Sequence, residues 1–270
     1  MSTATHTALA RPQWFSDTLT MFRRALLHNV RNPTGPISAI AGGIVILLLS
    51  VYVFGGTLGA GLVPGGTRED YLDYIAPAIV LMGAIGIMQM IAVWVATDMS
   101  EGIIARFRTM AIARSSVLAG HAYSGVVLVI ITIAPLLGFA VLLGYRPHAD
   151  ASQWLAVVGF ALLLGIAVSW LSVAFGLVPR RVENASTLPL IVLILPMVSS
   201  GFVPVASFPA WVKGFAQYQP FTPIINTLRG LLAGTPRASD VAWAIGWTIA
   251  IAIVGYVWSL WLYRRRAAGR

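Results

Sequence analysis

Residues 153–177 read QWLAVVGFALLLGIAVSWLSVAFGL, without a single charged side chain. About 20 apolar residues in a helix span the hydrocarbon core of a bilayer, so this stretch predicts a transmembrane helix. Working outward from it, five further charge-free runs occur along the chain, separated by short segments with proline, glycine or charge. The six predicted spans cover residues 37–54, 74–97, 122–144, 153–177, 187–203 and 241–263.

The composition supports an all-α integral membrane protein that forms a single domain over residues 1–270. The chain is 58% hydrophobic and 10% of its residues are charged, whereas about 25% charged residues are usual in soluble domains. Cysteine is absent, which excludes disulfides, thiolate zinc sites, iron–sulfur clusters and thiol nucleophiles. The only lysine is Lys213, followed by Gly214, so the chain cannot contain the GxxxxGK phosphate loop of nucleotide hydrolases.

The distribution of basic residues predicts how the chain is oriented in the membrane. A net charge of +9 would suggest nucleic acid as a partner of a polar protein, but here it is explained by membrane topology. Placing the N-terminus in the cytosol puts thirteen of the eighteen basic residues in cytosolic segments, as expected from the excess of Arg and Lys in cytosolic loops. We therefore expect a multi-pass protein of the plasma membrane, with both termini cytosolic and no nucleic-acid partner.

An amphipathic helix is predicted over residues 12–32, before the first span. Its apolar residues recur at spacings of three or four, and its basic residues lie on the remaining surface. This pattern is typical of a helix lying in the headgroup layer, either as a membrane anchor or as a docking element for a partner. The side chains that mark it are Trp14, Phe15, Phe22, Arg23 and Arg24, with Leu19, Leu26 and Val30 continuing the apolar face.

The segment 205–236, between the fifth and sixth spans, is apolar but interrupted by prolines and glycines. Its second half, residues 221–234, would be about 21 Å long as a helix, which is too short to cross a bilayer. We therefore predict an external re-entrant helical hairpin, which is tolerated where protein covers its broken backbone. The residues assigned to this external cap are Pro209, Trp211, Pro220 and Arg229.

The sequence contains no recognisable catalytic constellation. Its four histidines are scattered, and it has no HExxH pair, no GxSxG motif and no pair of acids inside a predicted span, which argues against an enzyme and against a resident metal. A few polar residues lie within the spans, among them Gln89, Ser199 and Ser200. They are candidates to line a path for an amphiphile, although interhelical hydrogen bonding is the commoner role of such residues.

The cytosolic loop 98–114, between the second and third spans, is the most informative polar segment. It begins DMSEGIIARFRTM, and three of its apolar side chains fall at positions i, i+4 and i+7 of a helix, flanked by arginines. A positively charged turn beside the membrane would explain the arginines but not an exposed apolar ridge. The residues assigned to a partner-docking helix are Gly102, Ile103, Arg106, Phe107, Arg108 and Met110.

The pattern D-x-x-x-G-I-I-x-R-F-R in this loop resembles the membrane subunits of ABC-2 exporters, specifically the daunorubicin-resistance-like permeases abundant in actinobacteria. A second set of motifs is similar to the segment that this family carries after its fifth span. These motifs are SGFVP at 200–204, FPAW at 208–211, QPFT at 219–222 and LRG at 228–230. The resemblance covers essentially the whole chain, with one departure at Ala111, where the family commonly has proline.

The resemblance implies a permease subunit that works with a second permease copy or homologue, as a homodimer or heterodimer, and with two separate cytosolic ABC ATPase subunits. Loop 98–114 would hold the coupling helix, seated in a groove of the ATPase, and the helix at 12–32 would brace it. No cofactor is expected in this chain, because ATP and Mg²⁺ would bind to the partner. Closure of the ATPases would bias the bundle between inward- and outward-facing arrangements, moving a hydrophobic or amphiphilic drug or membrane lipid outward.

Two other functions stay open at this point. Export of a polysaccharide or glycolipid by a permease of the same superfamily is compatible with the tryptophans of the predicted spans and their borders, although most resemble interfacial anchors. A membrane scaffold without transport function, or a lipid-modifying enzyme, is the alternative from a different class, although the lack of a catalytic constellation argues against the enzyme. Copurification with an ATPase subunit would separate this class from a transporter. The tryptophans in question are Trp94, Trp154, Trp170, Trp243, Trp247 and Trp258.

Overall fold

The computed structural model describes residues 14–62, 64–101, 114–179 and 181–268. The described residues form helices joined by turns, without a strand among them, which confirms the all-α class. The helices are α1 (Trp14–Arg31), α2 (Thr34–Leu49), α3 (Gly55–Leu62), α4 (Arg68–Ser100), α6 (Arg114–Leu142), α7 (Ala151–Leu177), α8 (Thr187–Ile194), α9 (Ala210–Tyr218), α10 (Phe221–Leu232) and α11 (Ala238–Ala268).

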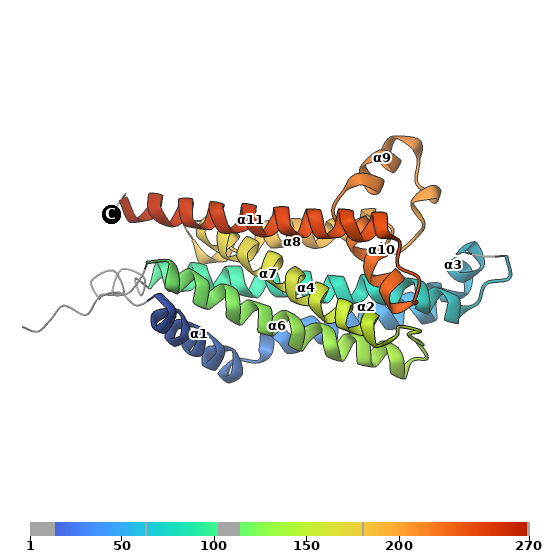
Figure 1. Cartoon of the computed structure of the whole chain (residues 1–270), viewed down its shortest axis with the longest axis horizontal. Coiled ribbons are helices and arrows are strands. Elements are labelled where there is room, and N and C mark those ends of the chain that lie inside the picture. Colours follow the sequence, from blue (N-terminus) through green and yellow to red (C-terminus); the bar gives the residue numbers. More distant parts are fainter. Residues whose placement is uncertain (1–13, 63, 102–113, 180, 269–270) are drawn as a thin grey trace, which may run out of the picture.

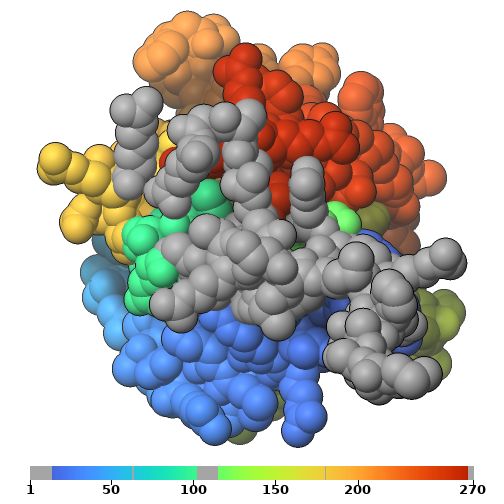
Figure 2. All heavy atoms as spheres, turned by 90° about the vertical axis from the view of Figure 1, so that its left-hand side faces the viewer, coloured from blue at the N-terminus to red at the C-terminus, as the bar shows by residue number. Residues whose placement is uncertain are grey.

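The long helices run side by side along one axis of the molecule (Figure 1). We call the end where α1 and the C-terminal turns of α11 lie the α1 end, and the opposite end, where α3 and α10 lie, the α10 end. Figure 2 views the α1 end, with α1 along one edge in blue and α11 on the opposite side in red. The two ends therefore differ in the elements that cover them.

Within the described residues, five helical segments are long and apolar enough to cross a membrane, and they correspond to five of the six predicted spans. The segments are Thr34–Leu62, Arg68–Ser100, Ser115–Leu142, Ala151–Leu177 and Ala238–Arg266. The remaining prediction, 187–203, corresponds to a shorter apolar stretch in which α8 gives way to a 3-10 turn at Leu195–Val198. Regular helix ends there because Pro196 lacks the amide proton that an α-helix needs, and Ser199 follows in an extended conformation.

The first crossing helix is longer than predicted. A π-helical segment, Ser50–Phe54, joins α2 directly to α3, so helical structure continues beyond residue 54 to Leu62. Glycine is required on this extension where α3 meets the start of α4. A Cβ atom added to Gly59 would lie 2.1 Å from the carbonyl oxygen of Thr67, so only a residue without a side chain allows this close approach.

Helix α4 is the centre of the bundle. In its most apolar stretch 72% of the residues are buried, compared with 17% for α11. Its N-terminus is fixed by a capping box, in which the Thr67 amide donates to Asp70 Oδ2 at 2.7 Å and the Asp70 amide donates to Thr67 Oγ1. Helices α2, α6, α7, α8 and α10 all pack against α4, so any site between helices is built around it.

Candidate functional site

The predicted coupling segment lies outside the described residues, since residues 102–113 include Gly102, Ile103, Arg106, Phe107, Arg108 and Met110. Its two attachment points are described. Helix α4 ends at Ser100 and α6 begins at Arg114, and both of these helix termini lie at the α1 end (Figure 1). The site can therefore be built from the helices that surround these attachment points.

Helix α1 packs on α6 through a narrow strip and leaves its apolar residues on the surface. Close packing is possible because Gly120 has no side chain: a Cβ atom there would lie 2.6 Å from Met21 Cβ. Trp14 adds a hydrogen bond from Nε1 to Ser115 Oγ at 3.1 Å. Thr18, Met21 and Asn29 are buried, Phe22 and Leu26 are partly buried, and Trp14, Phe15, Leu19, Arg23 and Val30 are exposed.

Helix α1 has an exposed apolar face and an exposed basic face. Phe15 is 76% exposed and Val30 69% exposed, on a helix whose other exposed face carries Arg23 and Arg24. An apolar stripe beside a basic stripe is the arrangement of helices that lie in the plane of the headgroups. In α1 a third stripe, facing α6, fixes the helix to the bundle.

A charged cluster joins α1, α4 and α6. Arg24 donates from Nη1 and Nη2 to the two carboxylate oxygens of Asp98, at 3.0 and 3.3 Å. Nε2 of His121 lies 3.1 Å from Asp98 Oδ2. A bidentate arginine–carboxylate pair has a fixed relative geometry, so the triad couples the position of α1 to the last turn of α4, just before the predicted coupling segment.

Beside this triad lies a cleft of about 470 Å³ between α1 and the end of α4. Its walls include His28, Asn29 and Arg31 from α1, and Trp94 and Glu101 from the α4 side. The His28 and Trp94 rings meet edge to face, with 5.1 Å between centroids. We call this space the α1 cleft.

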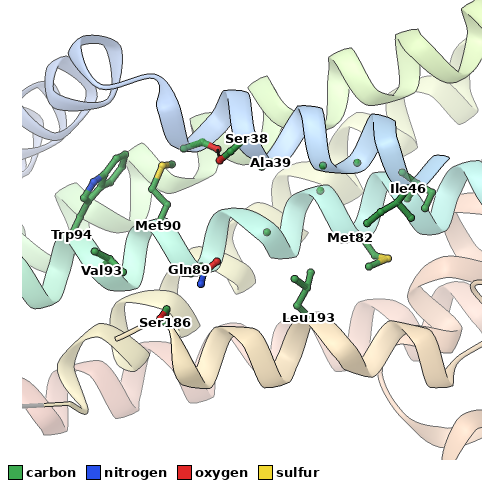
Figure 3. A pocket seen from close by; sticks show the side chains of 16 residues that line it. Ser38, Ala39, Ile46, Met82, Gln89, Met90, Val93, Trp94, Ser186 and Leu193 are labelled. Carbon is green, nitrogen blue, oxygen red and sulfur yellow. Dashed lines mark hydrogen bonds between the residues drawn. The ribbon is translucent and has the colours of Figure 1, made fainter. Parts of the chain in front are cut away.

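A groove of about 510 Å³ runs along the bundle between α2, α4 and α8. In Figure 3 it follows α4, with Ser38, Ala39 and Ile46 of α2 on one side and Leu193 of α8 on the other. Its lining is mainly apolar or small, and Gln89 and Ser186 add polar groups to the wall near α8. Trp94 lines both this groove and the α1 cleft, so the two spaces adjoin. We call it the α2–α8 groove.

The candidate pathway residues fall in two places. Gln89 lies on the α2–α8 groove, whereas Ser199 and Ser200 are buried at the α10 end. Ser199 donates a hydrogen bond to the Pro196 carbonyl, and Ser200 Oγ donates to Asn226 Oδ1 at 2.7 Å. Both serines therefore stabilise the irregular backbone after α8.

The α10 end is held by Arg229. Its guanidinium stacks on the Tyr74 ring, 3.8 Å from the centroid, and donates to the Tyr74 carbonyl from Nε at 3.1 Å and Nη2 at 2.9 Å. It also donates to the Ser200 carbonyl at 2.9 Å and to Asn226 Oδ1 at 3.0 Å. Arg229 thus ties α10 to the start of α4 and to the break after α8.

The remaining cap residues border two unequal helices. Pro209 precedes α9 and Pro220 precedes α10. Helix α9 projects from the bundle (Figure 1) and carries Trp211, which is 86% exposed. Helix α10 is buried along most of its length. The α6–α7 connection packs against its end, where the His148 amide donates to the Leu232 carbonyl at 2.8 Å.

Asp150 caps α7 at the same end of the bundle. Its Oδ1 accepts hydrogen bonds from Ser152 Oγ at 2.7 Å and from the Gln153 amide at 2.8 Å. These bonds, chiefly the one from Ser152, hold the pKa of Asp150 below its usual value. Among the described residues no group of three His, Asp or Glu side chains could hold a metal ion.

Reasoning from the sequence did not single out His121 or Asn29 as site residues. His121 is one of the four scattered histidines, and Trp94 was a candidate only as one of the tryptophans compatible with polysaccharide or glycolipid export. A signal was present: Asp98 directly follows the second apolar run, and an ionisable residue at the end of a span needs a partner. The partner could not be identified, because Arg24 is 74 residues away along the chain.

Comparison with known proteins places this geometry in a family. The profile of the ABC-2 type transporter family matches residues 16–233. A daunorubicin resistance ABC transporter permease of Streptomyces coeruleorubidus is 28% identical over 263 residues, covering 96% of this chain and 90% of the relative. A probable doxorubicin resistance ABC transporter permease of Mycobacterium tuberculosis is 28% identical over 215 residues, covering 80% of this chain and 78% of the relative.

Proposed function

Because the chain belongs to the ABC-2 type transporter family, we propose that it is the membrane-spanning permease of an ATP-driven exporter that moves a hydrophobic or amphiphilic substrate outward. The observation that carries this proposal is the α2–α8 groove, which adjoins the α1 cleft at Trp94. Together they offer an amphiphile a route along the bundle from one end. The energy comes from a separate cytosolic ATPase that binds ATP and Mg²⁺.

The ATPase docks on the segment 102–110. Support comes from the apolar ridge of Ile103, Phe107 and Met110, because burying each Phe or Met side chain in a partner groove contributes about 1.5–3 kcal/mol. Further support comes from the attachment points of this segment, which lie beside α1 and the Arg24–Asp98 pair. Movement of the segment would therefore reach α1 and α4 together.

A second permease copy or homologue completes the pathway. Small residues line the α2–α8 groove, among them Gly35 and Gly42 on α2 and Gly86 on the facing α4. Small residues favour close helix packing in membranes. Two grooves facing one another would enclose a path. Alternating access follows if closure of the ATPases favours one arrangement of α2 and α8 over the other through differential contacts.

Six crossings with both termini cytosolic are the topology that this function needs. The charge asymmetry of the loops supports it. The stretch from Val182 to Ser200 supports the fifth crossing, since α7 ends near the α1 end while Ser200 bonds to residues of the α10 end. Helix α10, with 12 residues, would be only about 18 Å long, which favours an external re-entrant cap over 205–236.

Pull-down of the cognate ATPase with the Phe107→Ala variant tests the function. We expect association to weaken at least about tenfold, which corresponds to ~1.4 kcal/mol, and substrate-stimulated ATP hydrolysis in vesicles to be lost. Membrane insertion should be unchanged, because the loop does not cross the bilayer. The control is Phe215→Ala, which truncates an exposed phenylalanine of α9 at the opposite end. Equal recovery of the ATPase and equal coupled activity for both variants would contradict the coupling assignment. If the wild type recovered no ATPase, a scaffold function would be favoured.

Glycolipid export is a second candidate, favoured by a cleft of about 460 Å³ at the α10 end. Trp243 and Trp247 line it together with Lys213, Gln217 and Asp240. Indole faces stack on apolar faces of ligands while polar side chains fix their orientation. Stimulation of the coupled ATPase by a glycolipid, but not by a phospholipid, would favour this candidate.

A further inference from the structure

The α1 cleft contains a buried amide that no other described residue satisfies. Asn29 is 4% exposed, and neither its Nδ2 nor its Oδ1 has a hydrogen-bond partner within residues 14–62, 64–101, 114–179 and 181–268. A buried polar group left without a partner costs about 1–3 kcal/mol, and the amide offers donors on one atom and an acceptor on the other. A ligand that supplies both an acceptor and a donor would remove this cost.

The charges of the cleft are balanced rather than of one sign. Arg24 and Arg31 contribute two positive charges, and Asp98 and Glu101 two negative charges. Asp98 is already engaged by Arg24 and His121. Arg31 and Glu101, on opposite sides of the cleft, have no ion pair among the described residues. A ligand of one sign would meet repulsion from one wall, whereas a zwitterion would be attracted by both.

The wall shared with the α2–α8 groove indicates what the rest of the ligand is. Trp94 separates the two spaces, and beyond it Met90, Val93 and Ile46 make an apolar lining. The exposed apolar face of α1 sets the depth of the cleft at the level of the headgroups. A ligand that fills both spaces carries a polar end at that depth and a hydrocarbon chain directed along the groove.

We propose that the α1 cleft binds the zwitterionic headgroup of an aminophospholipid, with its phosphate toward Arg31 and the Asn29 amide, its ammonium toward Glu101, and an acyl chain in the α2–α8 groove. This site rests on the proposed export function and names its substrate class, an inner-leaflet lipid that enters beside α1. The edge-to-face pair of His28 and Trp94 stands where the headgroup must pass to reach the groove.

Titration of the detergent-solubilised full-length permease with acyl-labelled lipids tests the site. Phosphatidylethanolamine should bind about tenfold more tightly than diacylglycerol with the same chains, since a charged hydrogen bond contributes about 1.5–3 kcal/mol. Phosphatidylglycerol should bind less tightly than phosphatidylethanolamine, because its headgroup lacks the ammonium. Soluble glycerophosphoethanolamine should compete only weakly, because it lacks the chain. Competition as strong as that of the intact lipid would overturn the assignment of the groove.

Three variants give a pattern that a merely structural role would not produce. Asn29→Leu should raise the thermal stability of the lipid-free protein, because it removes an unsatisfied amide, yet weaken phosphatidylethanolamine binding about tenfold. Arg31→Gln should weaken both phospholipids, and Glu101→Gln should remove the preference for phosphatidylethanolamine over phosphatidylglycerol. The control Arg23→Gln changes an exposed arginine of the same helix that does not line the cleft and should leave all affinities unchanged.

These measurements need no ATPase, so they separate the site from the proposed function. Equal affinities for the three lipids, or the same affinities in Asn29→Leu as in Arg23→Gln, would refute the lipid site while leaving the ATPase pull-down intact. Selective lipid binding by a permease that recovers no ATPase would refute the export function instead.

Discussion

An arginine joins distant helices at each end of the bundle, Arg24 at the α1 end and Arg229 at the α10 end, but their partners differ. At the α1 end, Arg24 pairs with the Asp98 carboxylate, and the arginine side chain is 41% exposed. At the α10 end, Arg229 is partly buried and binds the backbone carbonyls of Tyr74 and Ser200. The α1 end also has bonds to the backbone, because Arg266 of α11 donates to the Val178 and Pro179 carbonyls after α7. The junction of α1 with α4, however, is made by a side-chain ion pair, whereas the α10 end is joined by hydrogen bonds to the backbone.

The difference follows from what each end must satisfy. The chain after α8 is irregular, and its carbonyl groups have no helical partner, which is costly in a membrane protein. A guanidinium with five donors in a planar fork can satisfy several carbonyls at once, which a lysine could not do. Around Arg24 the backbone of α1 and α4 is helical, so this guanidinium is available for a carboxylate. An ion pair between side chains can re-form as helices shift, whereas bonds to backbone carbonyls hold a fixed shape. The α1 end suits movement, and the α10 end suits a static cap.

The largest effect should come from Arg229→Gln. The substitution leaves the Tyr74 and Ser200 carbonyls without their donors, and we expect the free energy of unfolding to fall by about 3 kcal/mol. Denaturant titration in detergent measures it, with Arg237→Gln, an exposed arginine before α11, as the control. High salt should change the loss little, because the partners of the guanidinium are neutral carbonyl groups. A loss no larger than that of the control would contradict the static-cap interpretation.

A smaller effect is expected from Asp98→Asn at the α1 end. The variant removes the charge that Arg24 and His121 share, and we expect a loss of about 1–2 kcal/mol. Because Arg24 is partly exposed, the difference from wild type should shrink as salt is added. Glu183→Gln, an exposed carboxylate of the α7–α8 connection with no ion pair among the described residues, is the control and should show no comparable salt-dependent loss. If the loss of stability in Asp98→Asn did not depend on salt, the α1 end would behave like the α10 end, and the proposed difference between them would be wrong.

The sequence predicts the helices of this fold better than it predicts their contacts. Charge-free runs locate the long helices because the bilayer requires about 20 apolar residues in each. The short α8 was harder, since the apolar run 187–203 continues through Pro196, where the helix ends. Composition alone does not register that interruption, although proline is a known local signal for it.

The residues that join the helices depend on rotation about each helix axis, which a charge-free run does not specify. Arg24, Asp98 and His121 meet only after α1, α4 and α6 have packed, and His121 and Asp98 are 23 residues apart. The motif LRG did single out Arg229. Its partners are backbone carbonyls, however, and because every residue has one, the sequence does not identify which of them accept a hydrogen bond. Asn29 lies on the face of α1 between the apolar and basic stripes, where neither pattern would find it.

The smallest predicted effect is a change of stability with pH at the α6–α7 connection. There Asp150 tests how the α10 end is held together. The connection also faces Asp73, which accepts a hydrogen bond from the Arg146 backbone and interacts with His148. The contribution of Asp150 is therefore isolated by comparing variants of Asp150 with wild type at each pH. The pKa of Asp150 is lowered in the folded protein by hydrogen bonds from Ser152 and Gln153, so its contribution is complete above the unfolded value of about 3.9 and is lost as pH falls through the lower, folded value.

Asp150→Asn keeps a residue that can still cap α7 but removes the charge, so its stability should fall below that of wild type near pH 6 and approach it in acid. Asp150→Ala loses the cap as well and should stay below Asp150→Asn at every pH. Thermal unfolding in detergent, followed from about pH 6 to pH 3, measures both differences. A gap between wild type and Asp150→Asn that widens in acid would have the wrong sign for a carboxylate stabilised in its charged form, and a second titrating group would then have to be sought at the α10 end. If the stability difference between wild type and Asp150→Asn closes in acid, the α10 end is held by groups that do not titrate in this range. The bonds from Arg229 to backbone carbonyls are such groups.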